Sequence, residues 1–178
     1  MILLVNTCKN KMSELEFVKP IEDIIKKNGF SCLIKNYKHV SKEDVRKSEK
    51  IIISGTALKD FDYLKKNFSW LDDKPVLGIC AGAQMIAKKF GNVLKDEEII
   101  GKFKVKLTEE NKLIGKKEFE SYFLLSKIFI TRKDLKILAF TNDIPVMFKH
   151  SNKEIYGCLF HPEVLNQEII LNFIISSY

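Results

Sequence analysis

A cysteine between two glycines follows an apolar run in the middle of the chain. Residues 75–79 form the run, Cys80 comes directly after it, and Gly78 and Gly82 flank the cysteine at the spacing G-x-C-x-G. This pattern is typical of a nucleophile elbow, in which a strand turns sharply into a helix and presents a reactive side chain at the turn. The partial positive charge at the start of that helix favours a thiolate. We therefore predict that Cys80 is a catalytic nucleophile.

A histidine and a carboxylate follow a second apolar run near the C-terminus. Residues 154–160 lead into His161, and Glu163 stands two positions further on, after a proline. A nucleophilic cysteine needs a base that takes its proton and a third group that orients the base. A solvated histidine or a surface carboxylate is common by itself, but their occurrence with the cysteine motif favours a triad of Cys80, His161 and Glu163.

The two motifs together resemble a known family. The segments G-I-C-A-G-A-Q and Y-G-C-L-F-H-P-E-V are similar to those of class I (triad-type) glutamine amidotransferases, and most similar to those of the glutaminase subunits of archaeal two-subunit GMP synthases. The resemblance covers most of the chain. It implies a flavodoxin-like α/β fold and hydrolysis of glutamine through a γ-glutamyl thioester, with no cofactor. It also implies delivery of ammonia to an ATP-dependent synthetase subunit on a separate chain.

The residues around the triad follow from the motif and from the resemblance. The N–H of Ala81, directly after the nucleophile, can stabilise an oxyanion. A second donor is expected at Gly55, where this chain reads S-G-T and the family usually reads G-G-P. Gln84 falls where the family has a glutamine that contacts the substrate. Ser121 and Tyr122 fall in the segment that helps to hold the amino-acid end of glutamine, with Tyr122 in place of the family's usual histidine.

Alternating strand-like and helix-like patterns must position these residues. The first half of the chain predicts strands over 1–6, 30–35, 50–54 and 75–79 and helices from a capping box at Ser13 to Asn28, from Ser41, over 59–68 and after the elbow. Such alternation favours a parallel sheet covered by helices on both faces. A ligand then binds beyond the carboxyl ends of the strands, where Cys80, His161 and the loop after residue 53 all fall.

The second half of the chain has a different pattern. Strand-like segments with short connections are predicted over 99–107, 119–130, 137–142, 145–150 and 154–160, followed by an amphipathic helix over 166–175. Short connections favour antiparallel or mixed pairing. The sequence therefore predicts an α/β fold whose central sheet is mostly parallel and gains antiparallel strands in this half.

Composition limits the class of protein. The 178 residues suit a single domain over 1–178, and the hydrophobic content of 46% indicates a globular chain. The net charge of +7 comes from lysines interleaved with acids, without a nucleic-acid-binding motif, so we do not expect nucleic acid as a partner. No apolar run approaches the ~20 residues of a membrane span, so we do not expect a membrane as a partner either. The four cysteines show no C-x-x-C pair and no ligand spacing to histidine, so we expect no disulfide framework, no metal site and a cytoplasmic location.

Three functions remain open from the sequence. The chain contains no phosphate-binding loop of the type that activates an acceptor with ATP, which favours a glutaminase working with a separate synthetase. The alternatives are a free-standing hydrolase of γ-glutamyl amides and a non-catalytic regulatory protein of the same fold. The presence of all three triad residues argues against the last.

Overall fold

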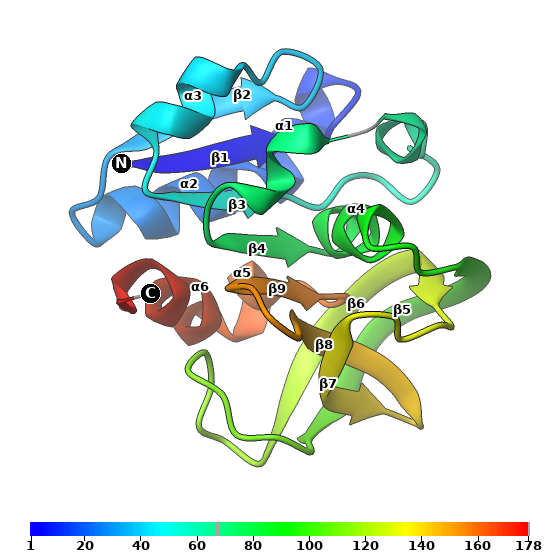
Figure 1. The fold of residues 1–178 in the computed structure, drawn as a ribbon. Coiled ribbons are helices and arrows are strands. Elements are labelled where there is room, and N and C mark those ends of the chain that lie inside the picture. The colour runs from blue at the N-terminus through cyan, green and yellow to red at the C-terminus, as the bar shows by residue number, and fades with distance from the viewer. Residues whose placement is uncertain (67, 178) are drawn as a thin grey trace.

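One nine-stranded sheet runs through the residues that the computed structural model describes, which are 1–66 and 68–177 (Figure 1). Its strands are β1 (Ile2–Asn6), β2 (Cys32–Asn36), β3 (Lys50–Ile53), β4 (Val76–Ile79), β5 (Leu94–Leu107), β6 (Glu118–Phe129), β7 (Leu135–Thr141), β8 (Ile144–His150) and β9 (Ile155–Cys158). Their order across the sheet is β2-β1-β3-β4-β9-β8-β7-β5-β6.

The sheet is parallel at one end and antiparallel at the other. The pairs from β2 through β1, β3 and β4 to β9 are parallel, and those from β9 through β8, β7 and β5 to β6 are antiparallel. Strands β1 and β4 are buried along their whole length, because the sheet is covered on both faces there. This arrangement confirms the predicted α/β class and the change of pairing in the second half.

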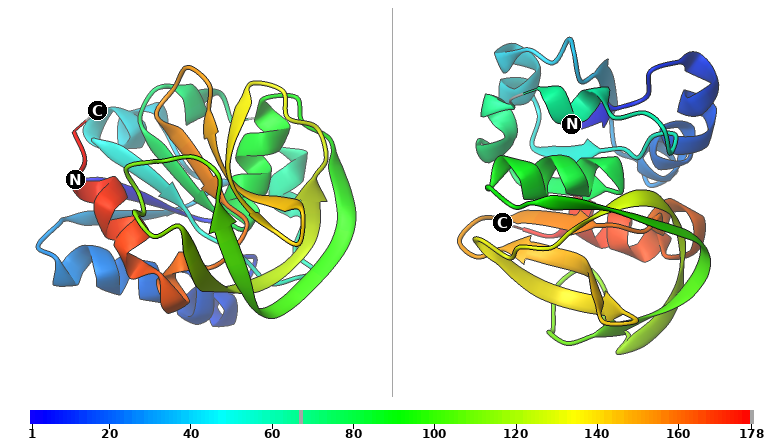
Figure 2. Two further views of the ribbon diagram at one scale, coloured as in Figure 1. Left: turned by 90° about the horizontal axis from the view of Figure 1, so that it is seen from below. Right: turned by 90° about the vertical axis from the view of Figure 1, so that its right-hand side faces the viewer.

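Helices cover both faces of the parallel part (Figure 2). They are α1 (Lys11–Phe17), α2 (Lys19–Lys27), α3 (Lys42–Lys47), α4 (Ala81–Lys89), α5 (Pro162–Leu165) and α6 (Gln167–Ile175), with two 3₁₀ helices, η1 (Asp62–Lys65) and η2 (Ser69–Asp72). Helix α2 packs against α5 and α6 on one face, and α4 packs against β4, β9 and η1 on the other. None of the described helices combines the length and apolar character needed to cross a membrane.

The predicted first helix is two helices. The predicted capping box at Ser13 is wrong, because Asn10 caps α1 and its side chain accepts a hydrogen bond from the Ser13 N–H at 3.1 Å. The chain breaks at Val18, and Pro20 lies in the first turn of α2. Proline has no N–H to continue the hydrogen bonding of α1, whereas the first turn of a helix tolerates it.

The segment predicted as one helix over 59–68 does not form a single α-helix in its described residues. The described residues of this segment form η1, and η2 follows it, while residue 67 lies outside the described residues. Tyr63, Phe68 and Trp70 are all buried. Their spacing does not match one face of an α-helix, so a broken path of short helices buries them better.

The strands predicted in the second half are all present within a few residues. The largest difference is β5, which begins at Leu94 and contains a register shift between Asp96 and Ile99. The alternation along β5 is as predicted, since Val105 is buried and Lys104 and Lys106 are exposed.

Candidate active site

Cys80 lies at the turn between β4 and α4. Its backbone has φ 49° and ψ −101°, a conformation that a residue with a side chain rarely adopts. Its N–H donates to the Cys158 carbonyl at 2.7 Å, which extends the pairing of β4 with β9 as far as the turn. The chain then enters α4 at Ala81, whose N–H has no acceptor within the helix because it belongs to the first turn. The geometry is that of a nucleophile elbow.

The two flanking glycines allow the elbow to pack against the sheet. A Cβ on Gly78 would lie 2.5 Å from the backbone carbon of Gly82. A Cβ on Gly82 would lie 2.5 Å from the Ile53 carbonyl oxygen, on the neighbouring strand β3. Both distances are shorter than the non-bonded contacts that Cβ atoms make in proteins, and the obstructing atoms belong to the backbone. Glycine is therefore required at both positions by close approach of the chain.

Replacing Gly82 by alanine should destabilise the protein. Alanine is the better helix former by about 1 kcal/mol, but overpacking of a tight site costs about 1–3 kcal/mol, and here the backbone of β3 has little freedom to move. We expect a net loss of about 2 kcal/mol in the free energy of unfolding, measured by urea denaturation.

The matched control is Gly115→Ala, because no heavy atom lies within 4 Å of the Cβ that would be added there. This variant should stay within about 0.5 kcal/mol of the parent protein. Equal stability of the two variants would contradict the close packing of the elbow.

His161 and Glu163 form a buried pair beyond the end of β9. His161 precedes α5 and Glu163 lies in its first turn. The imidazole Nδ1 is 2.7 Å from Glu163 Oε1, and the two residues are only 2% and 4% exposed. The His161 N–H donates to the Tyr122 carbonyl at 2.8 Å, which attaches the loop to β6. The ring is therefore held from its Nδ1 side and by its own backbone.

The surroundings of His161 favour its protonated form. Burial by itself lowers the pKa of His161, but the charges of Glu163 and Cys80 and the hydrogen bond to Glu163 outweigh burial and raise this pKa well above 6.5. The pair can therefore hold a proton on the imidazole near neutral pH, as a base that has taken a thiol proton must do.

This pKa predicts how stability depends on pH. A base whose pKa is higher in the folded state stabilises the fold at pH values below its unfolded pKa, and this contribution disappears as the pH rises through the folded pKa. The unfolding free energy of the parent protein minus that of His161→Asn should therefore fall as the pH is raised from about 6 to about 9. Urea denaturation across this range measures the difference, and a constant or rising difference would contradict the raised pKa.

Cys80 and His161 both lie close to Gly55. A Cβ on Gly55 would lie 2.7 Å from His161 Cε1 and 3.5 Å from Cys80 Cβ. The Cys80 thiol donates to the Leu124 carbonyl on β6 at 3.4 Å. The imidazole Nε2 is buried and has no hydrogen-bond partner among the described residues. The nitrogen that would take the thiol proton is thus unoccupied by any other hydrogen bond to the described chain.

The loop that carries Gly55 is anchored by hydroxyl groups. The Thr7 hydroxyl lies 3.0 Å from the Ser54 carbonyl and 2.8 Å from the Gly55 carbonyl, and the Ser54 hydroxyl donates to the latter at 2.9 Å. In a trans peptide the N–H points away from the carbonyl of the same unit. Because both carbonyls are anchored toward Thr7, the N–H groups of Gly55 and Thr56 point away from Thr7. The role of the Gly55 N–H, with that of Ala81, in stabilising an oxyanion stays a prediction.

Gln84 lies in the wall of a small cavity beside Cys80. Its Oε1 accepts a hydrogen bond from the Tyr63 hydroxyl, and its Nε2 donates to the Lys127 carbonyl at 2.9 Å. The cavity has a volume of about 10 Å³, which holds about one water molecule. A side chain as large as that of the predicted substrate, glutamine, would therefore reach Cys80 only if part of the wall moves.

Ser121 and Tyr122 lie on β6 close to the triad. Ser121 is fully buried, and its hydroxyl has no hydrogen-bond partner among the described residues. Tyr122 uses its carbonyl to hold His161. Contact of either residue with the substrate's amino-acid end stays a prediction. Sequence motifs did not indicate Tyr63, Thr7 or the carbonyl of Leu124, and they could not indicate the last because any residue type supplies a carbonyl.

Two further features describe the chemistry of the site. Cys8, Cys32, Cys80 and Cys158 are all free thiols. In the part of the chain that the structure describes, no three His, Cys, Asp or Glu side chains are grouped so that they could hold a metal ion. The arrangement is suited to nucleophilic attack by sulfur with proton transfer through an imidazole.

Comparison with known proteins identifies relatives of this chain. The profile of the family described as Glutamine amidotransferase class-I matches residues 13–175. The chain is 34% identical over 109 residues to a protein of Methanococcus maripaludis named as a glutamine-hydrolyzing GMP synthase subunit, a match that covers 58% of each chain. It is 36% identical over 115 residues to GMP synthase [glutamine-hydrolyzing] of Petrotoga mobilis, covering 56% of this chain and 22% of the longer protein. The matches thus span less than two thirds of these relatives.

Solved structures share the fold. A structure described as that of a putative GMP synthase subunit from Thermoplasma acidophilum superposes with a TM-score of 0.83 at 24% identity, covering 98% of this chain and 92% of that one. A glutamine amidotransferase from Thermotoga maritima superposes with a TM-score of 0.68 at 18% identity, covering 92% and 76%. At these identities the likeness shows the fold.

Proposed function

Because the chain belongs to the class I glutamine amidotransferase family, an enzymatic family, we propose that it hydrolyses glutamine through Cys80, His161 and Glu163. The observation that carries the proposal is the buried His161–Glu163 pair, held at 2.7 Å beyond β9, beside the strained Cys80 at the end of the adjacent strand β4. Neighbouring parallel strands that end in a nucleophile and its base suit acyl transfer.

The reaction proceeds through a thioester. His161 takes the thiol proton, and the Cys80 sulfur attacks the carboxamide carbon of glutamine. The N–H groups of Ala81 and Gly55 stabilise the resulting oxyanion. Collapse breaks the C–N bond, and His161 returns its proton to the departing nitrogen, so ammonia leaves. Water, deprotonated by His161, then cleaves the γ-glutamyl thioester and releases glutamate, and the proton returns to the sulfur.

The ammonia goes to a synthetase on a separate chain. The relatives named as GMP synthase subunits support this assignment, and GMP synthesis is the specific pathway we propose. The small volume of the cavity beside Cys80 fits an enzyme whose site opens only when a partner is bound, which limits loss of ammonia to water. The free thiols fit a reducing, cytoplasmic setting.

Ammonia release from glutamine tests the proposal. We expect slow release by the isolated chain and a large stimulation by an ATP-dependent GMP synthetase subunit with ATP and the nucleotide acceptor present. Full activity without any partner would instead support a free-standing hydrolase of γ-glutamyl amides. No ammonia under either condition, from a correctly folded chain, would contradict the proposal and favour a regulatory protein.

A further inference from the structure

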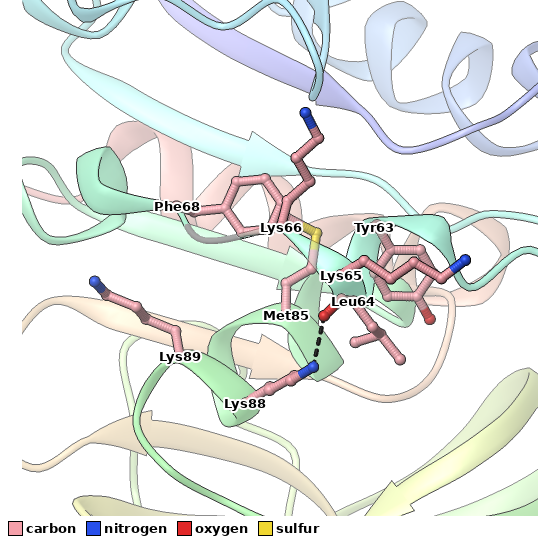
Figure 3. Close-up of a pocket in the computed structure, with 8 residues that line it drawn as sticks. All are labelled: Tyr63, Leu64, Lys65, Lys66, Phe68, Met85, Lys88 and Lys89. Atoms are coloured by element: carbon pink, nitrogen blue, oxygen red, sulfur yellow. Dashed lines mark hydrogen bonds between the residues drawn. The ribbon is translucent and has the colours of Figure 1, made fainter.

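A basic groove lies outside the active site, between η1 and α4 (Figure 3). Its volume is about 390 Å³, far larger than that of the cavity beside Cys80. Four lysines surround it, and its apolar lining comes from Leu64, Phe68 and Met85. The lysines are Lys65, Lys66, Lys88 and Lys89. We call this feature the lysine groove.

The positive charge of the lysine groove is only partly compensated by the chain. Lys65 pairs with Asp62 at 2.8 Å, and Lys88 donates to the Leu64 carbonyl at 2.6 Å, as the dashed line in Figure 3 marks. Lys66 and Lys89 form no ion pair with any described residue, and no Asp or Glu is among the described residues that line the groove. The groove therefore attracts negative charge.

The position of the groove favours carboxylates over phosphate. Phosphate groups are commonly held by N–H groups at the start of a helix. Lys88 and Lys89 instead belong to the last turn of α4, where the helix has no free N–H groups. Separate flexible ammonium groups around an apolar floor suit an acidic segment that also carries leucine or phenylalanine. Met85 adds an adaptable surface for such side chains.

Tyr63 connects the lysine groove with the active site. Its side chain lines both the groove and the small cavity beside Cys80. Burial raises the pKa of Tyr63, so its hydroxyl keeps the proton that it donates to Gln84. A ligand that shifts η1 must therefore also shift the wall of the cavity that glutamine has to enter.

We propose that the lysine groove docks an acidic, apolar-anchored segment of the synthetase partner, and that docking opens the glutamine pocket through Tyr63. The inference rests on the proposed partner-dependent function and names the surface and the chemistry by which the partner acts. A segment that binds the groove more tightly when the pocket is open shifts the population toward the open form.

A binding measurement tests the docking part. The probe is a short fluorescein-labelled peptide in which glutamates alternate with leucine and phenylalanine, and inorganic pyrophosphate serves as the competing anion. The double variant Lys66→Glu/Lys89→Glu should weaken peptide binding by about tenfold or more, because it replaces two attractive charges by two repulsive ones. The control is Lys27→Glu/Lys117→Glu, which reverses one exposed lysine in the last turn of α2 and one in a loop and should leave binding unchanged.

Labelling of Cys80 by a glutamine-like chloroketone tests the coupling. The peptide should raise the labelling rate about tenfold in the parent and the control, within the usual range for coupled sites, but not in the groove variant. All variants are first shown to unfold with the parent's cooperativity. Equal peptide binding by both double variants, complete displacement by pyrophosphate, or binding without faster labelling would overturn the inference while leaving the proposed function intact. Lysine-dependent peptide binding by a chain whose Cys80 is never labelled would instead contradict the proposed function.

Discussion

Replacing Cys80 by serine should lower the rate of ammonia release from glutamine by a factor of at least about 10³, because removal of a nucleophile abolishes the covalent pathway. Serine keeps the size of the side chain and the strained turn at φ 49°. A hydroxyl is a much weaker nucleophile than a thiolate under the same base. Ammonia is measured with a coupled dehydrogenase assay, with the same partner and substrates for both proteins.

The control for this prediction is Cys32→Ser. Cys32 is a half-buried thiol on β2, at the far edge of the sheet from the antiparallel strands. Its replacement should leave the rate within about a factor of two, since substitutions away from the site rarely cost more than about 0.5 kcal/mol. Comparable activity of the parent and Cys80→Ser proteins would show that the sulfur of Cys80 does not carry the reaction.

Replacing Glu163 by glutamine should lower kcat by roughly 10²–10⁴-fold. The carboxylate holds His161 Nδ1 at 2.7 Å and is one of the groups that raise the pKa of His161. A neutral amide of the same shape keeps the packing but removes the charge that stabilises the protonated ring. KM should change little, because Glu163 is buried behind the imidazole and does not face the cavity beside Cys80.

The matched control is Glu110→Gln, an exposed carboxylate in the loop that follows β5. Its kcat should equal that of the parent protein. The pH profile separates catalysis from structure: loss of Glu163 should move the apparent pKa of the base downward, whereas simple destabilisation would lower activity without moving it. A kcat unchanged by Glu163→Gln would remove Glu163 from the triad.

The local patterns were sufficient to predict at which strand ends the candidate site residues lie. The G-x-C-x-G motif fixed the turn at Cys80, and the apolar run before His161 fixed the end of β9. Because β3, β4 and β9 are parallel neighbours, the Gly55 loop, Cys80 and His161 all follow carboxyl ends at one edge of the sheet. The fold class and the antiparallel second half followed from the same periodicity and from connection lengths.

Contacts made by β6 could not be predicted in this way. The carbonyls of Tyr122 and Leu124 reach His161 and Cys80 because the antiparallel strands bring β6 back over α4, and nothing local in the sequence sets that order. The segment around Tyr63 was wrongly predicted as one helix, since burial of irregularly spaced aromatic residues outweighed helical propensity. The wall of the cavity beside Cys80 was missed for that reason.

Covalent labelling by a glutamine-like diazoketone, mapped by mass spectrometry, tests the role of Cys80 as the nucleophile most directly. Burial raises the pKa of Cys8 to about 12 and that of Cys32 to about 11, and it also raises the pKa of Cys158, so these three remain unreactive thiols near neutral pH. We expect a single adduct on the peptide that contains Cys80, formed more slowly when glutamine is present in excess. An adduct on Cys8, Cys32 or Cys158 with Cys80 unmodified would show that Cys80 is not the nucleophile.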